Sequence, residues 1–313
     1  MIVQRLLSSS VIGVVGLACK AFLNIGFKQV AVSGIHNLLN ALDDSERKKG
    51  RGIVTVSNHI STLDDPVTWG TLPFRCFTNL HDMRWTLGAS DIVFTNPVFS
   101  AFFRKGQVLE TFRGNGVYQE SVDTAIKKLN EGLWVHLFGE GKVNQPYQYQ
   151  LLQDTDNHGC AHDGELVAKL PRFKWGVGRI LADSDRLPVV IPMWLSGFEN
   201  VMPEPRPAGF PAKFLPRFRQ SIRVCFGEKL DENELKRVLM AVGTPSPVPI
   251  SYPTNTIIKR DSIPENVIER QRQWEAVTAL VHQSVENLGY SVSGPLLGLP
   301  HSPFLMAKPY TSR

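Results

Sequence analysis

Short apolar runs of strand length alternate with helix-like segments along much of this chain of 313 residues. Most of the runs are continuous enough to be buried on both faces of a sheet. Between two of them, the segment from Val117 to Asn130 has helical periodicity and is followed by Gly132. This alternation predicts an α/β fold with a mostly parallel mixed sheet flanked by helices. The predicted strands are Ile53–Ser57, Val108–Phe112, Leu133–Phe138, Val189–Met193 and Ser221–Phe226.

The first thirty residues form an apolar segment with a polar stripe. The stripe carries Arg5, Gly16 and Lys20, and no Asp or Glu precedes Asp43. A cationic, small-residue face opposite a wide apolar face is typical of an amphipathic helix lying in a membrane interface. A helix docked on the protein's own core and a cleaved signal peptide are the alternatives. No stretch reaches the roughly 20 apolar residues that a transmembrane helix needs. The apolar face comprises Val3, Leu7, Val11, Val14, Ala18, Phe22 and Ile25.

A second apolar stretch runs from Ile92 to Phe103, and Arg104 and Lys105 follow it. Aromatic residues followed by paired cations suit insertion to the depth of lipid headgroups, and burial in the core is the plain alternative. The predicted membrane contacts in the two segments are Val11, Val14, Val15, Phe22, Phe94, Phe99, Phe102 and Phe103.

His59 and Asp64 follow the predicted strand Ile53–Ser57. Positions five apart point about 140° away from each other on one helix, so the two side chains can meet only across a turn. Asp64-Asp65-Pro66 reads as a helix start, with Asp65 as a cap. A histidine oriented by a carboxylate can take a proton from an alcohol, which predicts acyl transfer to a hydroxyl. Taken alone, the pair is structural about as often as catalytic.

Two further strand ends carry polar residues beside glycines. Arg113 and Gly114 precede a helix, where a guanidinium and helical N–H groups can hold a phosphate, although the glycine also suits a turn. Glu140 and Gly141 follow the next strand, where the carboxylate can reach the crevice at the sheet edge. The predicted substrate-binding residues are Asn58, Arg113, Gly114, Glu140 and Gly141.

The overall composition indicates a globular protein with a modest basic excess. Hydrophobic residues make up 42%, and the formal net charge of +5 favours an anionic partner such as a phospholipid surface. Nucleic acid is disfavoured because no long basic run or recognition motif occurs. No Walker A, G-x-G-x-x-G or G-x-S-x-G pattern is complete, and the four cysteines form no CxxC pair. The sequence therefore predicts no cofactor, no bound metal and reduced thiols.

The order of His59/Asp64, Arg113, Glu140 and Pro192 resembles the glycerolipid acyltransferase family. Its four ordered motifs are an HxxxxD box, an arginine block, a Phe-Pro-Glu-Gly box and a Val/Ile-Pro block, and the likeness runs from about Gly52 to Gly227. The chain departs from the family at Gly139, where the family usually has proline. Its polar insertion from 145 to 169 is also longer than the family pattern.

The resemblance implies a glycerol-3-phosphate acyltransferase-like fold and a phospholipid–lysophospholipid transacylase without coenzyme A or covalent intermediate. It makes His59 the base and Asp64 its partner. It further implies cardiolipin, monolysocardiolipin and phosphatidylcholine as lipid partners, at mitochondrial membranes facing the intermembrane space. The alternatives are an acyl-CoA-dependent lysophospholipid acyltransferase and a non-catalytic lipid-binding scaffold. The sequence leaves a homo-oligomer open.

Composition and resemblance together divide the chain into five segments. A metal site at His158 and His162 within the polar insertion is disfavoured, because such loops seldom fix ligand geometry. A C-terminal helix is predicted by an apolar side that includes Trp274 and Val281, with Gly289 at its end. The segments are an interfacial helix over 1–30, an acyltransferase domain over 31–244 with its insertion loop over 145–169, a proline-broken loop over 245–263, a helix over 264–289 and a flexible tail over 290–313.

Overall fold

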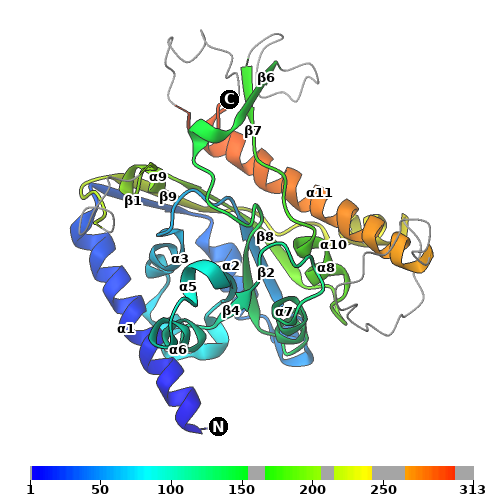
Figure 1. Cartoon of the computed structure of the whole chain (residues 1–313), viewed down its shortest axis with the longest axis horizontal. Coiled ribbons are helices and arrows are strands. Elements are labelled where there is room, and N and C mark those ends of the chain that lie inside the picture. The colour runs from blue at the N-terminus through cyan, green and yellow to red at the C-terminus, as the bar shows by residue number, and fades with distance from the viewer. Residues whose placement is uncertain (1, 154–165, 206–214, 242–264, 300–313) are drawn as a thin grey trace.

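The computed structural model describes residues 2–153, 166–205, 215–241 and 265–299 (Figure 1). The predicted loop over 245–263, the histidines at 158 and 162, and the tail beyond 299 lie outside these ranges.

A seven-stranded mixed sheet forms the centre of the protein. Its order is β1-β9-β8-β2-β5-β3-β4, and every neighbouring pair is parallel except β8 with β9. The predicted α/β fold with a mostly parallel mixed sheet is therefore confirmed. The strands are β1 (Gln29–Ser33), β2 (Ile53–Ser57), β3 (Trp85–Ala89), β4 (Val108–Thr111), β5 (Trp134–Phe138), β8 (Val189–Ser196) and β9 (Ser221–Phe226).

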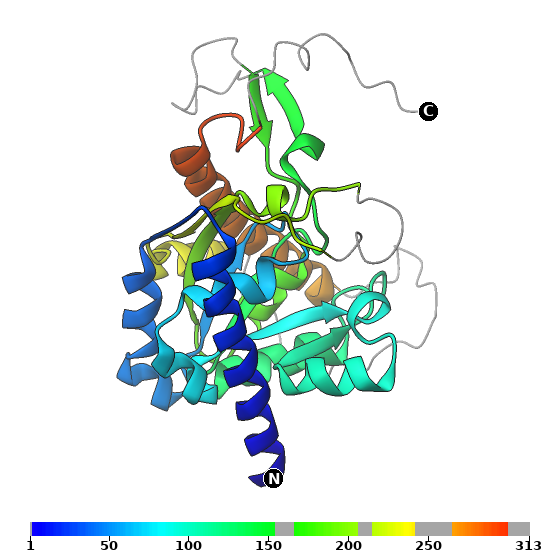
Figure 2. The same cartoon turned by 90° about the vertical axis from the view of Figure 1, so that its left-hand side faces the viewer.

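Helices cover both faces of the sheet (Figure 1). One layer contains α7, α8 and α11, and the other contains α1 to α6 (Figures 1 and 2). Among the described residues, the α-helices are α1 (Ile2–Gly26), α2 (Ile35–Leu42), α3 (Asp64–Val67), α4 (Phe74–Thr78), α5 (Ser90–Val93), α6 (Pro97–Lys105), α7 (Glu120–Asn130), α8 (Gly176–Ala182), α9 (Phe198–Val201), α10 (Glu232–Ala241) and α11 (Glu265–Ser293). The 3-10 helices are η1 (Ser45–Lys49), η2 (Thr68–Thr71), η3 (Leu80–Asp82) and η4 (Pro146–Gln148).

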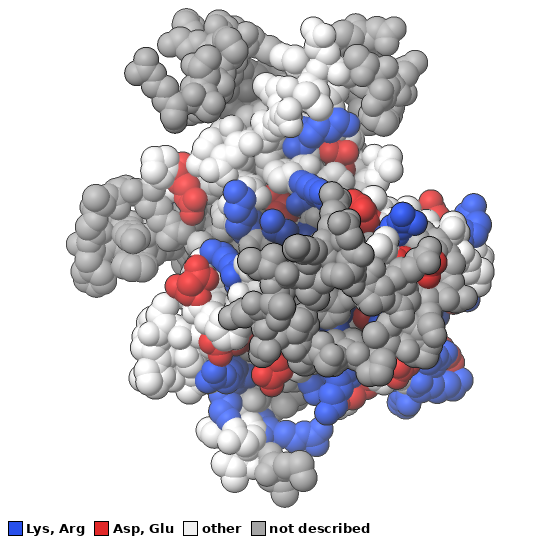
Figure 3. Space-filling model, turned by 45° about the vertical axis from the view of Figure 1, so that its right-hand side comes forward, with Lys and Arg blue, Asp and Glu red and all other residues white. Residues whose placement is uncertain are grey.

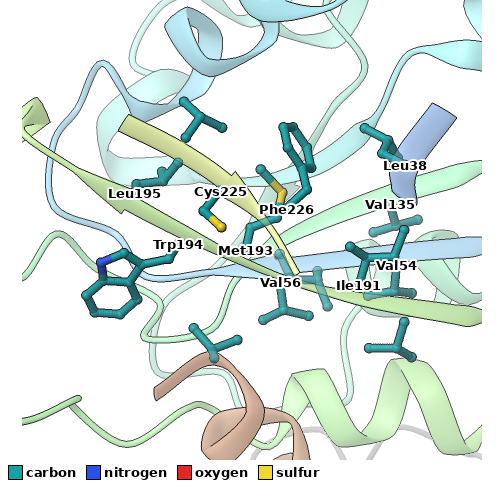
Figure 4. Close-up of a cluster of buried hydrophobic side chains, with 14 of the residues drawn as sticks. Leu38, Val54, Val56, Val135, Ile191, Met193, Trp194, Leu195, Cys225 and Phe226 are labelled. Carbon is teal, nitrogen blue, oxygen red and sulfur yellow. The ribbon is translucent and has the colours of Figure 1, made fainter. Parts of the chain in front are cut away.

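The hydrophobic core lies on both sides of the central strands. Val54, Val56 and Ile191 of β2 and β8 are buried, and they lie between Leu38 of α2 and the α8/α11 layer (Figure 4). Strands covered on both faces need apolar side chains at successive positions, which is why these two read as continuous apolar runs. Helix α7 starts at Glu120, three residues after its predicted start, because the backbone of Gln119 is extended at φ −151°.

Strands β1 and β3 were not predicted from the sequence. In β1 no residue is buried, and in β3 only Thr86 is buried, so neither strand carries the run of apolar side chains that marks a central strand. Strand β1 begins at Gln29, so the predicted N-terminal segment over 1–30 already enters the sheet at its end.

The polar insertion is not a plain loop in its described parts. Strands β6 (Gln150–Gln153) and β7 (Leu166–Lys169) pair antiparallel and project from the body (Figure 2). The phenol of Tyr290, beyond the predicted helix end, donates a hydrogen bond of 2.9 Å to the carbonyl of Ala168. This contact ties the base of the hairpin to the C-terminal helix.

Helix α11 continues to Ser293, past its predicted end at Gly289. Gly289 is a packing residue, since an added Cβ would lie 2.7 Å from the Trp194 ring. The left-handed residue that follows the helix is Gly294, with φ +75°. Leu297 beyond it is 1% exposed, so residues 290–299 belong to the packed body and the predicted flexible tail does not begin at 290.

Candidate active site

The candidate site lies at the carboxyl end of β2, between β5 and β8. Ser57, the last residue of β2, is in register with Phe138 of β5 and Met193 of β8. The amide of Gly139 donates a hydrogen bond of 3.2 Å to the Ser57 carbonyl. This pairing brings the turn that carries His59 beside the turn that carries Glu140.

His59 and Asp64 meet across the turn, as their spacing predicts. Nδ1 of His59 lies 2.9 Å from Oδ2 of Asp64. Because an ionised carboxylate only accepts, Nδ1 carries the proton and Nε2 keeps its lone pair. The imidazole stacks on the ring of Phe138, with centroids 4.1 Å apart, and its side chain is 19% exposed. The arrangement therefore provides an oriented base with access to solvent.

Asp64 is held by the backbone of its own turn. Its Oδ2 accepts hydrogen bonds from the amides of Ile60 at 2.7 Å and Ser61 at 2.9 Å, in addition to His59. Its side chain is fully buried, and Oδ1 has no hydrogen-bond partner among the described residues. Burial raises the pKa of Asp64, and the hydrogen bonds and the charge of His59 oppose that rise.

Asp65 does not cap the helix that begins at Asp64. Its carboxylate pairs with the guanidinium of Arg84, which is 7% exposed, and also accepts from the indole of Trp69. Because Arg84 directly precedes β3, this buried pair ties the turn after β2 to the second strand from the sheet edge.

Glu140 supports the turn instead of reaching into the crevice. Its Oε1 accepts a hydrogen bond of 2.8 Å from the amide of His59, and its Oε2 accepts from the Asn144 side chain. The amide of Asn144 in turn donates to the His59 carbonyl at 2.7 Å. Glu140 is 2% exposed, and burial raises its pKa to about 8. These contacts occupy both oxygens of the carboxylate that the sequence assigns to substrate binding.

Asn58 is likewise a structural residue. Its Nδ2 donates to the Leu195 carbonyl at 2.9 Å, and its Oδ1 accepts from the Leu195 amide at 2.8 Å. The side chain is fully buried. With both ends bonded to the backbone of β8, the amide cannot make the predicted contact with substrate.

Close packing surrounds Gly139, the position at which the family usually has proline. An added Cβ at Gly139 would lie 2.4 Å from the Phe173 ring, so the turn packs flat against that residue. The Gly139 carbonyl also accepts from the amide of Lys174 at 2.8 Å. Two backbone hydrogen bonds therefore fix this turn without a proline. Gly141 has φ +71°, which favours glycine.

Arg113 lies at the same sheet edge but away from His59. It follows β4, three strands from β2, which corresponds to about 14 Å at the usual strand spacing. Its side chain is 44% exposed and lies 3.4 Å from Asp91. Gly114 has φ +85°, and nothing lies within 4 Å of an added Cβ there. The loop is open, as a headgroup site requires, and the hydrogen bond of Arg113 within the described part of the chain goes to Asp91 and not to the His59 turn.

Arg179 is a buried cation within a basic and aromatic stretch of the sequence. The basic-aromatic segment around it suggests a solvated face or a headgroup contact, whereas the side chain is 1% exposed. It donates to the Val117 carbonyl at 2.6 Å and pairs with Asp123 and Asp183. The guanidinium also lies 5.0 Å from the Tyr118 ring. Arg179 thus anchors the end of the loop that carries Arg113.

The predicted membrane residues lie on one side of the body. Helix α1 packs against α6, and its N-terminal half extends beyond the body (Figure 2). Val14, Phe99 and Phe102 are exposed, whereas the predicted contacts Val11, Val15, Phe22, Phe94 and Phe103 are half-buried. We call the exposed set the apolar surface, and it comprises Val3, Leu6, Leu7, Val14 and Leu17 of α1 with Val98, Phe99 and Phe102 of α6.

Helix α1 also corrects two expectations about the N-terminus. By length and composition, Val3–Gly26 is long and apolar enough to cross a membrane. The prediction that no stretch of the chain is long enough for a transmembrane helix is therefore wrong. Such a helix near an N-terminus is weak evidence for a span. The predicted polar stripe faces solvent only in part: Arg5 is exposed, whereas Gly16 and Lys20 pack against the body.

Charges elsewhere on the surface are mixed. Figure 3 shows Lys and Arg side chains interspersed with Asp and Glu on the face it displays. Within the described ranges, no group of three or more His, Cys, Asp or Glu side chains could hold a metal ion.

Comparisons with known proteins agree with the motif order. A taffazin of Dictyostelium discoideum is 38% identical over 203 residues, which cover 64% of this chain and 63% of that protein. A tafazzin of Drosophila melanogaster is 33% identical over 239 residues, covering 76% of this chain and 53% of that protein. The chain thus spans less than two thirds of the length of either protein.

The match to a third relative covers a larger share of that relative's length. An N-acylphosphatidylethanolamine synthase of Arabidopsis thaliana is 35% identical over 226 residues, which cover 71% of this chain and 70% of that protein. The family described as Acyltransferase matches residues 29–196, from the start of β1 to the end of β8. Because this match covers more than half of the chain and includes the His59 turn, the chain belongs to the acyltransferase family.

Proposed function

We propose that the chain transfers an acyl group directly from a phospholipid to a lysophospholipid, without coenzyme A. The observation that carries the proposal is the contact between His59 and Asp64, in which a buried carboxylate orients a partly exposed imidazole. The likeness to two tafazzins supports the choice of lipid substrates.

In the proposed reaction, Nε2 of His59 removes the proton from the acceptor hydroxyl as its oxygen attacks the carbonyl carbon of the donor ester. The donor's glycerol oxygen leaves and takes up the proton from the imidazolium. Asp64 stabilises the imidazolium between these two steps. Glu140 positions the backbone of His59, and Arg113 at the outer end of the sheet edge holds a headgroup phosphate. No bond to the protein forms.

The proposed acceptor is monolysocardiolipin, with phosphatidylcholine as donor and cardiolipin as product. The proposed location is a mitochondrial membrane facing the intermembrane space. The apolar surface supports contact with a lipid bilayer, because large apolar side chains are exposed on two helices that pack against each other.

The test is acyl transfer on bilayers without coenzyme A. Vesicles contain phosphatidylcholine with a labelled acyl chain and monolysocardiolipin, and labelled cardiolipin is measured over time. Wild type should form labelled cardiolipin, and His59→Ala should lose on the order of 100- to 10,000-fold of the rate. His36→Ala, which removes an exposed histidine of α2, should keep the wild-type rate.

Three results would overturn the proposal or its parts. Transfer that begins only after acyl-CoA is added identifies the CoA-dependent alternative. Full transfer by His59→Ala identifies a scaffold or another base. A second set of vesicles also contains phosphatidylethanolamine, because the Arabidopsis relative is named for the N-acylated form of that lipid. Label on that amine, with none on cardiolipin, would reject the hydroxyl acceptor.

A further inference from the structure

Helix α1 has two faces with different surroundings. Its outward face carries the exposed residues of the apolar surface, such as Val14 and Leu17. Its inward face carries Ile12, Cys19 and Leu23, which are 5%, 9% and 7% exposed. A helix that served only as an anchor would not need this second, buried face.

The inward face packs on the segment that follows the catalytic turn. Helix η2 directly follows α3, whose first residue is Asp64. An added Cβ at Gly70 of η2 would lie 2.9 Å from the backbone carbon of Cys19 and 3.0 Å from the amide nitrogen of Lys20. At Gly16 an added Cβ would lie 2.6 Å from the Phe77 ring. Gly70 thus lets the backbones of α1 and η2 approach closely, and Gly16 makes room for the Phe77 ring of α4.

The Lys20 side chain links α1 to the end of η2 by hydrogen bonds. Its Nζ donates hydrogen bonds to the carbonyls of Leu72 at 2.8 Å and Gly70 at 3.2 Å. These carbonyls lie at the end of η2, where helical carbonyls lack partners and a cation is favourable. Helix α1 also contacts α3, the helix that begins at Asp64.

We propose that α1 is a positioning element for the catalytic turn as well as a lipid contact, and that Lys20 is the positioning residue. The inference rests on the proposed acyl transfer. Lys20 holds η2, η2 is continuous with α3, and α3 carries the carboxylate that orients His59. Without the hydrogen bonds from Lys20, Asp64 moves relative to His59. A displacement of about 1 Å at such a site costs on the order of 100-fold in rate.

The test separates catalysis from membrane binding. Turnover is measured with short-chain phosphatidylcholine and short-chain lysophospholipid, both dispersed as monomers, and binding is measured with phosphatidylcholine vesicles. Lys20→Met should lower kcat by about 10- to 100-fold with KM and vesicle binding unchanged. Lys20→Arg, which can still donate to both carbonyls, should restore most of kcat. Gly70→Ala should lower kcat in the same way, since it pushes α1 away without a change of charge.

Lys28→Met is the matched control, because it removes an exposed lysine just after the same helix. It should keep the wild-type kcat. Equal kcat for Lys20→Met and Lys28→Met would overturn the inference. A loss explained entirely by unfolded protein, with normal turnover per folded chain, would overturn it too. A wild-type chain without any transfer would instead reject the proposed function.

Discussion

Asp64 loses its hydration on folding, and its neighbours compensate. Removing a carboxylate from water costs several kcal/mol unless hydrogen bonds and a partner charge replace the water. Two backbone amides and the His59 ring converge on one oxygen, Oδ2. Those donors come from the five residues that precede Asp64, so the hydrogen bonds of the turn hold the carboxylate on the inner side, while η2 and Lys20 hold the other end of the segment. A pair that is ambiguous in the sequence thus becomes a defined dyad in the fold.

Glu140 leads to a prediction about stability and pH. Burial raises its pKa to about 8 from an ordinary 4.5. A raised carboxyl pKa means that the folded state binds the proton more tightly than the unfolded state does. The resulting stability is complete below about pH 4.5 and is lost as pH rises through about 8. The free energy of unfolding should therefore fall between pH 5 and 8.5, and Glu140→Gln should flatten that fall.

The measurement is urea unfolding at a series of pH values. Glu131→Gln, which changes an exposed carboxyl after α7, should keep the wild-type pH dependence. A Glu140→Gln protein with the wild-type slope would show that Glu140 stays ionised in the fold, stabilised by its two N–H donors.

Sequence reasoning at the residue level succeeded where partners are close in the chain. His59 and Asp64 are five residues apart, and the flanking strand and Pro66 indicate a turn. Asn58 is bonded to Leu195, 137 residues away, and no local pattern announces that contact. Glu140 has the same difficulty, because its partner amide is 81 residues earlier. In the sequence, a polar residue beside a candidate catalytic residue looks the same whether its side chain binds substrate or bonds to the backbone.

The elements divide by how their side chains are buried. Strand β2 has all five residues buried, and its sequence predicts both of its ends correctly. Strand β3 is as long as β2, but four of its five residues are half-buried, so apolar periodicity is weak there. Glycines are ambiguous for a similar reason. Gly289 resembles a helix end, yet it continues the helix because the Trp194 ring occupies the space of a side chain.

Arg179 shows how one buried side chain can position a loop. It joins α8 to the Val117 carbonyl and to Asp123 of α7. Breaking a buried ion pair costs about 3–5 kcal/mol, and the lower end of that range applies here because Asp123 is 33% exposed and Asp183 keeps a hydrogen bond from Trp274. Arg179→Met should lose stability on that scale and should speed amide hydrogen exchange between Arg113 and Gln119.

Arg186→Met provides the comparison for this loop. Arg186 is 41% exposed and pairs with Glu46, so its loss should cost about 0–1 kcal/mol and leave exchange in the 113–119 loop unchanged. Equal losses of stability for the two variants would contradict the anchoring role of Arg179.

On the scale of the whole molecule, the proposed lipid contacts and the candidate site share one layer. The helices of the apolar surface belong to the same side of the sheet as α3 (Figures 1 and 2). Helix α11 and the β6–β7 hairpin lie away from it. The net charge and the apolar stripe of residues 1–30 could indicate a lipid partner, but neither could reveal that α1 and α6 pack together. That contact depends on the fold between them.

The exposed side chains of the apolar surface should determine how tightly the protein binds lipid vesicles. Leu17 of α1 and Phe102 of α6 are 48% and 44% exposed, so burial in lipid removes roughly half of each side chain from water. At 1.5–3 kcal/mol for a full side chain, each contributes about 1 kcal/mol, or about fivefold in partition. Leu17→Ser and Phe102→Ser should each weaken binding to vesicles about fivefold, and the double variant about 25-fold.

Sedimentation with phosphatidylcholine vesicles at high salt measures this partition without electrostatic attraction. Val32→Ser, an exposed apolar residue of β1 outside the apolar surface, should bind like wild type. The product of the two single effects matters more than either one, because α1 alone could insert as a free anchor. An anchor of that kind would make Leu17→Ser weaken binding while Phe102→Ser had no effect. Multiplying effects require both helices to enter the lipid together, which fixes the orientation of the His59 turn relative to the bilayer.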